Sequence, residues 1–141
     1  MRATLDSRMR FFVRNAFLTR LTYNNTTNTL HYNLTVEVAI PAEHATIDYL
    51  SAAVSYHNIT FASHPVETLI QDFNGLRLRF DGERYIMLTH VQLSKVNYDN
   101  MSGFYNLTLN LWPPKMRTPE ELLCDLQLPI HHYVRCNGID D

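Results

Sequence analysis

The sequence predicts an all-β fold, an antiparallel β-sandwich of two sheets with seven to eight short strands and at most one short helix. Three observations lead to this prediction. Apolar and polar residues alternate with a period of two in several segments, polar turn signals separate these segments, and only one helix start is well formed. With 141 residues, the chain has the length of a single domain.

The clearest alternation covers residues 30–40, where the even positions are apolar and all but one of the odd positions are polar. Successive side chains of a strand point to opposite faces, so this pattern predicts a half-buried strand. The same alternation predicts further strands at residues 50–56, 76–80, 105–111 and 124–130. Residues 11–21 and 85–93 are less regular but rich in strand-forming residues, so we expect strands there as well.

Turn signals separate these segments. Residues 24–28 form a polar cluster, and His57-Asn58 predicts a tight hairpin that leads into a strand at 59–62. Two further dipeptides tolerate positive φ, namely Asn74-Gly75 and Asp81-Gly82.

The one good helix start is Thr-Pro-Glu-Glu at residues 118–121. It combines a capping threonine, a proline in the first turn and a glutamate at the capping-box position. We expect one to two turns of helix there, because the strand pattern resumes at Cys124.

The composition excludes several classes of protein. The net charge is −2, so the chain has no basic excess to neutralise phosphates, and we expect no nucleic-acid partner. Charged residues make up only 18% of the chain, which indicates a neutral polar surface. No segment reaches the length of about 18 apolar residues that a membrane span needs, and the first residues lack the apolar region of a secretory signal.

The chain contains six Asn-x-Ser/Thr triplets, the acceptor sequence for N-glycosylation. Their asparagines are Asn24, Asn25, Asn33, Asn58, Asn100 and Asn106. Chance predicts about 1.6 such triplets at this composition, so six is an excess. Asn33 and Asn106 lie on the polar side of their expected strands, where a glycan can face solvent. The excess favours a domain that faces the secretory lumen, and the alternative is a Thr- and Asn-rich β surface that is never glycosylated.

Cys124 and Cys136 are the only cysteines. In an oxidising compartment they could form a disulfide, and because the loop that it closes is short, its stabilisation of the fold would be limited to about 3 kcal/mol. The alternative is two free thiols, with Cys124 as a small core residue. The excess of glycosylation triplets favours the disulfide.

We find no spacing that catalysis requires, so we expect neither enzymatic activity nor a cofactor. The chain lacks His-Glu-x-x-His, Gly-x-Ser-x-Gly and a glycine-rich phosphate loop. The remaining enzymatic hypothesis is a metal-dependent hydrolase that uses His131, His132 and Asp125. Arg77 and Arg79 share one strand face with no evident acidic partner, which indicates a solvated edge face. The alternative is a ligand site on that face of the sheet.

Several motifs, taken in order, resemble a plant family. Residues 10–21 are R-F-F-V-R-N-A-F-L-T-R-L, and residues 24–40 contain N-T-L-H-Y-N-L-T-V. They are followed by A-A-V-S-Y-H-N-I-T-F at 52–61, S-G-F-Y-N at 102–106 and C-D-L-Q-L-P at 124–129. This order resembles the harpin-induced, non-race-specific-disease-resistance-like proteins, which carry the late-embryogenesis-abundant type 2 domain.

The resemblance implies a sandwich akin to fibronectin type III. It also implies a non-enzymatic ectodomain, on the extracellular face of the plasma membrane, of a membrane-anchored protein associated with the defence response. Its partners would be proteins at the membrane or cell wall. We expect residues 10–136 to form the domain, residues 1–9 to follow a membrane span that this chain does not contain, and residues 137–141 to be a tail. The alternative is a soluble cytoplasmic stress-protective binding module of the same fold.

Overall fold

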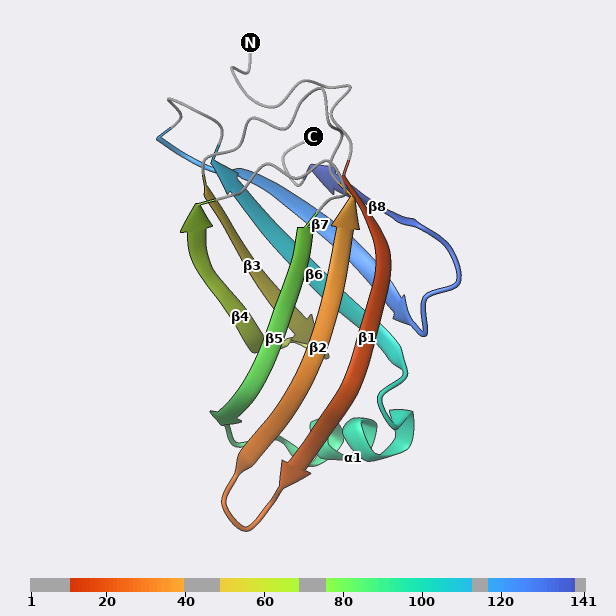
Figure 1. Cartoon of the computed structure of the whole chain (residues 1–141). Helices are drawn as coiled ribbons and strands as arrows, with labels where there is room; N and C mark the ends of the chain where they lie inside the picture. Colours follow the sequence, from red (N-terminus) through yellow and green to blue (C-terminus); the bar gives the residue numbers. More distant parts are fainter. Residues whose placement is uncertain (1–10, 40–48, 69–75, 113–116, 139–141) are drawn as a thin grey trace.

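The computed structural model describes residues 11–39, 49–68, 76–112 and 117–138. These residues form eight strands and one short helix (Figure 1). The elements in chain order are β1 (Phe11–Asn24), β2 (Thr29–Ala39), β3 (Tyr49–Tyr56), β4 (Ile59–Thr68), β5 (Leu76–Tyr85), α1 (His90–Asp99), β6 (Gly103–Trp112), β7 (Glu120–Leu128) and β8 (Val134–Gly138). The prediction of an all-β fold with seven to eight strands and at most one short helix is confirmed.

The eight strands form one antiparallel, nearly closed sheet in the order β4-β3-β6-β7-β8-β1-β2-β5. The sheet curls so that β1, β2 and β5 lie in front of β3, β4, β6 and β7 in Figure 1. The short strand β8 connects these two halves, because it pairs with β1 through Phe11 and Cys136 and with β7 through Leu122 and Gly138. The division into two separate sheets stays a prediction.

The core lies between the two halves and consists of aliphatic and aromatic side chains together with the two cysteines. Alternate residues of β2 and β6 point into it, including Leu34 and Val36 from β2 and Leu107 and Leu109 from β6. Within the described part of the chain, no polar or charged residue is buried among them. Each such aliphatic side chain contributes about 1.5–3 kcal/mol through its burial, so the period-two pattern is the main determinant of the fold.

The strand predictions agree with the structure at most positions. Turns occupy residues 25–28 and the His57-Asn58 dipeptide, where φ is 48° and 66°, so both of these turn predictions are confirmed. The turn expected at Asp81-Gly82 is wrong, because β5 continues through it and pairs with β2 as far as Tyr85. Gly82 lies against Tyr32, whose Oη atom would be 3.1 Å from a Cβ at position 82. The dipeptide Asn74-Gly75 lies outside the described residues.

The helix lies at a different place from the one predicted. Residues 118–121 do not form a helix, because Glu120 begins β7 and pairs with Leu111 of β6. The helix is α1, and it begins inside residues 85–93, where we expected a strand. A capping box explains this start: the Thr89 side chain accepts a hydrogen bond from the Gln92 backbone, and the Gln92 side chain accepts one from the Thr89 backbone.

Strand β8 has no counterpart in the sequence prediction, and it includes Asn137 and Gly138 of the expected tail. The expected N-terminal segment, residues 1–9, and residues 139–141 lie outside the described residues.

The open edges of the sheet belong to β4 and β5. Strand β5 exposes charged side chains along its outer face, at Arg77, Arg79, Asp81 and Glu83. The expectation that Arg77 has no acidic partner is wrong, because its Nη2 atom lies 3.0 Å from Oε2 of Glu37 on β2. The register places these two residues opposite each other, which the sequence alone does not reveal.

Candidate functional site

The six candidate glycosylation asparagines are accessible to different extents. Five of them are exposed, namely Asn24, Asn25, Asn58, Asn100 and Asn106, whereas Asn33 on β2 is half-buried. Asn25 and Asn58 lie in turns, Asn24 is the last residue of β1, and Asn100 is the C-cap of α1 with a left-handed backbone. The attachment of glycans at these residues stays a prediction.

Four of these asparagines lie at the same end of the molecule. Asn24 and Asn25 lie at the β1–β2 hairpin, Asn58 at the β3–β4 hairpin, and Asn100 at the end of α1. In Figure 1 these elements lie at the end opposite to the start of β1 and the end of β8.

The structure joins Cys124 and Cys136 in a disulfide, with their Cα atoms 4.3 Å apart. Cys124 lies on β7 and Cys136 on β8, and both side chains are buried. The bond therefore holds the last described strand against the core, and the expected disulfide fits this geometry.

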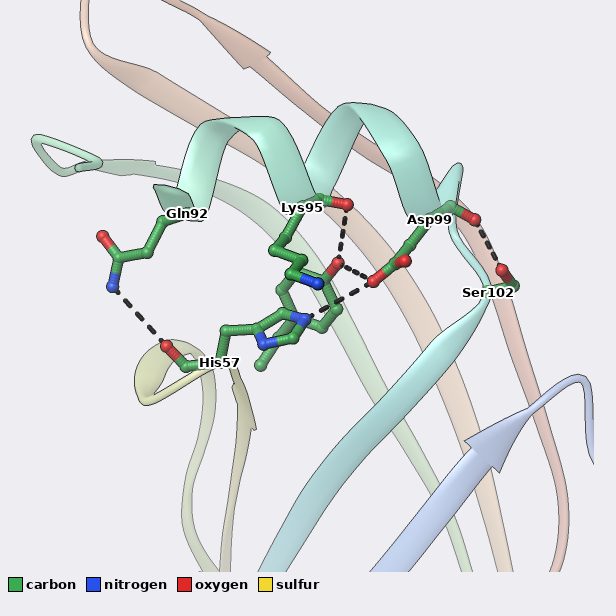
Figure 2. Close-up of polar contacts among 6 residues, drawn as sticks. His57, Gln92, Lys95, Asp99 and Ser102 are labelled. Carbon is green, nitrogen blue, oxygen red and sulfur yellow. Dashed lines mark hydrogen bonds and ion pairs between the residues drawn. The ribbon is translucent and has the colours of Figure 1, made fainter. Parts of the chain in front are cut away.

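A cluster of polar groups lies where α1 meets the β3–β4 hairpin (Figure 2). Tyr56 is the last residue of β3, and its single hydroxyl proton is shared between the Lys95 carbonyl oxygen, at 3.0 Å, and the Asp99 carboxylate. The Nε2 atom of His57, in the hairpin turn, lies 3.4 Å from the same carboxylate oxygen. Gln92 Nε2 completes the contact by donating to the His57 carbonyl oxygen at 3.5 Å.

The cluster changes the acidity of its members. The hydrogen bond from Tyr56 lowers the pKa of the Asp99 carboxyl, and the neighbouring His57 adds to this effect. Burial raises the pKa of Tyr56, and its hydrogen bond to Asp99 raises it further. Tyr105 stacks on Tyr56 with ring centroids 4.7 Å apart, and burial also raises the pKa of Tyr105. The carboxylate is therefore ionised and both phenols are protonated at neutral pH.

The cluster fastens α1 to the sheet. Only Val96 of α1 is buried, so apolar burial alone holds this helix weakly. Asp99 ends the helix, where the helix dipole disfavours a negative charge. Tyr56 and His57 compensate for this placement by contacting the carboxylate from the hairpin.

Further contacts hold the segment that precedes α1. The Tyr23 hydroxyl donates to the Ile86 carbonyl oxygen at 2.9 Å and accepts from the Leu88 backbone N–H at 3.4 Å. We therefore assign these polar groups a structural role.

The hypothesis of a metal site at His131, His132 and Asp125 finds no support in the structure. Asp125 points outward from β7 opposite Asn106, and both histidines are exposed beyond the end of β7. No three His, Cys, Asp or Glu side chains gather around a metal-sized position within residues 11–39, 49–68, 76–112 and 117–138.

Comparisons with known proteins identify no relative. No family model matches the chain, and neither a curated protein nor a solved structure matches it. The resemblance to the plant late-embryogenesis-abundant type 2 family therefore stays a prediction. In the described part of the chain, no helix has the length and apolar character that crossing a membrane would require.

Sequence reasoning missed the contact between Tyr56 and Asp99. The two residues are 43 positions apart. In addition, the sequence prediction placed a strand at residues 85–93, so it contained no helix that ends at Asp99. One signal could have found it: Thr89-His90-Val91-Gln92 is a capping box that starts a helix long enough to reach Asp99.

Proposed function

We propose that this domain is the non-enzymatic ectodomain of a plant membrane-anchored protein associated with the defence response. In this proposal it is a member of the late-embryogenesis-abundant type 2 family. It lies on the extracellular face of the plasma membrane and binds protein partners at the membrane or cell wall. The observation that carries the proposal is the exposure of five of the six candidate glycosylation asparagines.

The exposure matters because a sequon on a buried face could not hold a glycan in the folded state. Asn58 and Asn106 are exposed although their next neighbours in sequence, Ile59 and Leu107, are buried. The disulfide between Cys124 and Cys136 supports the same location, because disulfides persist in oxidising compartments.

The placement of the asparagines also suits an anchored ectodomain. The candidates at Asn24, Asn25, Asn58 and Asn100 lie at the end opposite to Phe11, the first residue of β1. A membrane anchor upstream of Phe11 would leave this end facing away from the bilayer. Glycans there would meet the extracellular space rather than the lipid surface.

We also propose that the fold belongs to the fibronectin type III kind of sandwich. The facing halves, β5-β2-β1 and β4-β3-β6-β7, enclose a single apolar core and support this assignment. The proposal that the domain is not an enzyme rests on the polar cluster at α1. The side chains of this cluster bond to each other and to the backbone of α1, so they hold the helix in place.

The test is the mass of the protein from its native tissue, before and after enzymatic removal of N-glycans. We expect the mass to fall by several glycan masses, and a titration under denaturing, non-reducing conditions to find no free thiol. No change in mass together with two reactive thiols would overturn the proposal. That result would favour the soluble cytoplasmic binding module of the same fold.

A pair of variants makes the test specific to the sequons. Asn58→Gln removes one exposed asparagine inside a triplet, and Asn97→Gln removes one outside any triplet. We expect Asn58→Gln to remove one glycan mass and Asn97→Gln to remove none. Equal masses for the two variants would show that Asn58 carries no glycan.

A further inference from the structure

Aromatic residues precede the candidate glycosylation sites more often than composition predicts. Four of the six asparagines have an aromatic residue two positions earlier, in the pairs Tyr23/Asn25, Tyr56/Asn58, Tyr98/Asn100 and Phe104/Asn106. Aromatic residues make up 11% of the chain, so fewer than one such pair is expected by chance. The excess raises the question of what these aromatic side chains do.

The structure separates the four pairs into two groups. Tyr23 and Tyr56 are at least partly buried, and their hydroxyls hold the segment around α1 through hydrogen bonds. Tyr98 and Phe104 are 86% and 68% exposed, so neither side chain is packed into the core. The core therefore accounts for the first two aromatic residues but not for Tyr98 and Phe104.

Phe104 and Asn106 have the simpler geometry, because both lie on β6. Residues 105, 107, 109 and 111 of this strand are buried, so Phe104, Asn106 and Thr108 share its outer face. Residues two apart on a strand are separated by about 6.6 Å, so the side chains of Phe104 and Asn106 stand next to each other.

Small or polar side chains surround this pair. Asn106 is flanked by Ser55 of β3 and Asp125 of β7, and Phe104 lies opposite the exposed Gln127 of β7. Neither the Asn106 amide nor the Phe104 ring has a hydrogen-bond or aromatic partner among the described residues. By contrast, Oδ1 of Asn24 accepts hydrogen bonds from the backbone N–H groups of Thr26 and Thr27.

We propose that Asn106 carries an N-linked glycan and that Phe104 is the platform on which its first sugar stacks. This inference rests on the proposed function. In the attachment step, the Asn106 amide nitrogen forms a bond to C1 of N-acetylglucosamine in a lipid-linked oligosaccharide. The bond from C1 to the diphosphate breaks, and a base of the transferase takes the amide proton. The sugar's axial C–H groups, which carry partial positive charge, then lie against the electron-rich face of the Phe104 ring.

The contact gives the exposed phenylalanine a function. Stacking would remove apolar ring surface from water and would restrict the sugar's orientation over the face of β6. The pair Tyr98/Asn100 has the same spacing, but Asn100 has a left-handed backbone at the end of α1, so a shared strand face does not align the two side chains. Phe104/Asn106 is therefore the pair to test.

The experiment is a double-mutant cycle between the platform and the glycan. The 141-residue chain is directed into the secretory pathway of cultured plant cells by an appended signal sequence, and occupancy at Asn106 is read from peptide masses. Thermal unfolding is then measured for the unsubstituted chain, Phe104→Ala, Asn106→Gln and the double variant. We expect Phe104→Ala to lower Tm by about 2–4 °C when Asn106 is glycosylated, and by less than about 1 °C in the Asn106→Gln background.

Partial removal of the glycan tests which sugar contacts Phe104. An endoglycosidase that leaves one N-acetylglucosamine on each asparagine should preserve the difference between the two backgrounds, whereas complete removal of the glycan should abolish it. Tyr133→Ala is the matched control, because Tyr133 is 67% exposed but no sequon lies two residues after it. Its effect on Tm should be the same in both backgrounds.

Two results would overturn the inference. Asn106 could remain unmodified while other sequons are occupied, or Phe104→Ala could lower Tm equally with and without the glycan. Failure of the proposed function would look different, because the chain from native tissue, without an appended signal, would carry no glycan at any site.

Discussion

Two stacked tyrosines allow a direct test of how the polar cluster at α1 works. Tyr56 and Tyr105 are 3% and 1% exposed, and removal of either hydroxyl takes away a single atom from a buried site. The Tyr56 hydroxyl bonds to the Lys95 carbonyl oxygen and the Asp99 carboxylate. The Tyr105 hydroxyl has no hydrogen-bond partner among the described residues.

The structure predicts opposite effects for the two substitutions with phenylalanine. Tyr56→Phe removes a donor to an ionised group, and hydrogen bonds to charged groups contribute about 1.5–3 kcal/mol to stability. Tyr105→Phe removes a hydroxyl that is desolvated without compensation, so the free energy of unfolding should stay the same or rise by up to about 1 kcal/mol.

The assay is equilibrium unfolding in urea at pH 7, followed by far-UV circular dichroism. Both variants should keep the slope of the wild-type transition, since neither changes the buried area much. Only the midpoint of Tyr56→Phe should fall. A loss of stability in Tyr105→Phe as large as that in Tyr56→Phe would refute the reasoning, because ring packing rather than hydrogen bonding would then explain both.

Three further predictions concern the same region and the disulfide. Asp99→Asn should destabilise the fold at pH 7. Because the folded-state pKa of Asp99 is lowered, the ionised contact contributes above its unfolded pKa and is lost as pH falls, so the difference from wild type should shrink between about pH 5 and pH 2 in urea unfolding. Gly103→Ala should cost about 1–3 kcal/mol in the same assay, because φ is +104° and the new Cβ would lie 3.1 Å from the Asp99 carboxylate. Reduction of Cys124–Cys136 should lower the free energy of unfolding by about 3 kcal/mol, and a Tm unchanged by reductant would contradict this.

Sequence reasoning succeeded where one physical effect dominated. In β2 and β6, every second residue is apolar, and all of these residues are buried except Tyr32, which is half-buried, so burial energy and strand periodicity lead to the same assignment. It failed at residues 118–121, where a good helix start lies beside Leu122 and Cys124. The pairing of β7 with β6 and the disulfide between Cys124 and Cys136 outweighed the local helix signal there.

The candidate site was predictable only in part. The asparagine triplets are local patterns, so their positions could be read from the sequence, and their turns at residues 24–28 and 57–58 were also foreseen. The contact of Tyr56 with Asp99 depends on where α1 ends and on how β3 approaches it. The pairing of Arg77 with Glu37 depends on register, which no single strand specifies.

The charged outer face of β5 has a consequence for the behaviour of the protein in concentrated solution. Five of the ten residues of β5 are charged, whereas charged residues make up 18% of the whole chain. Strand β5 also lies at an edge of the sheet. An open edge offers unpaired backbone groups to other chains, and charged side chains there oppose intermolecular strand pairing. The high charge of β5 thus protects an edge of the sheet at which aggregation could begin.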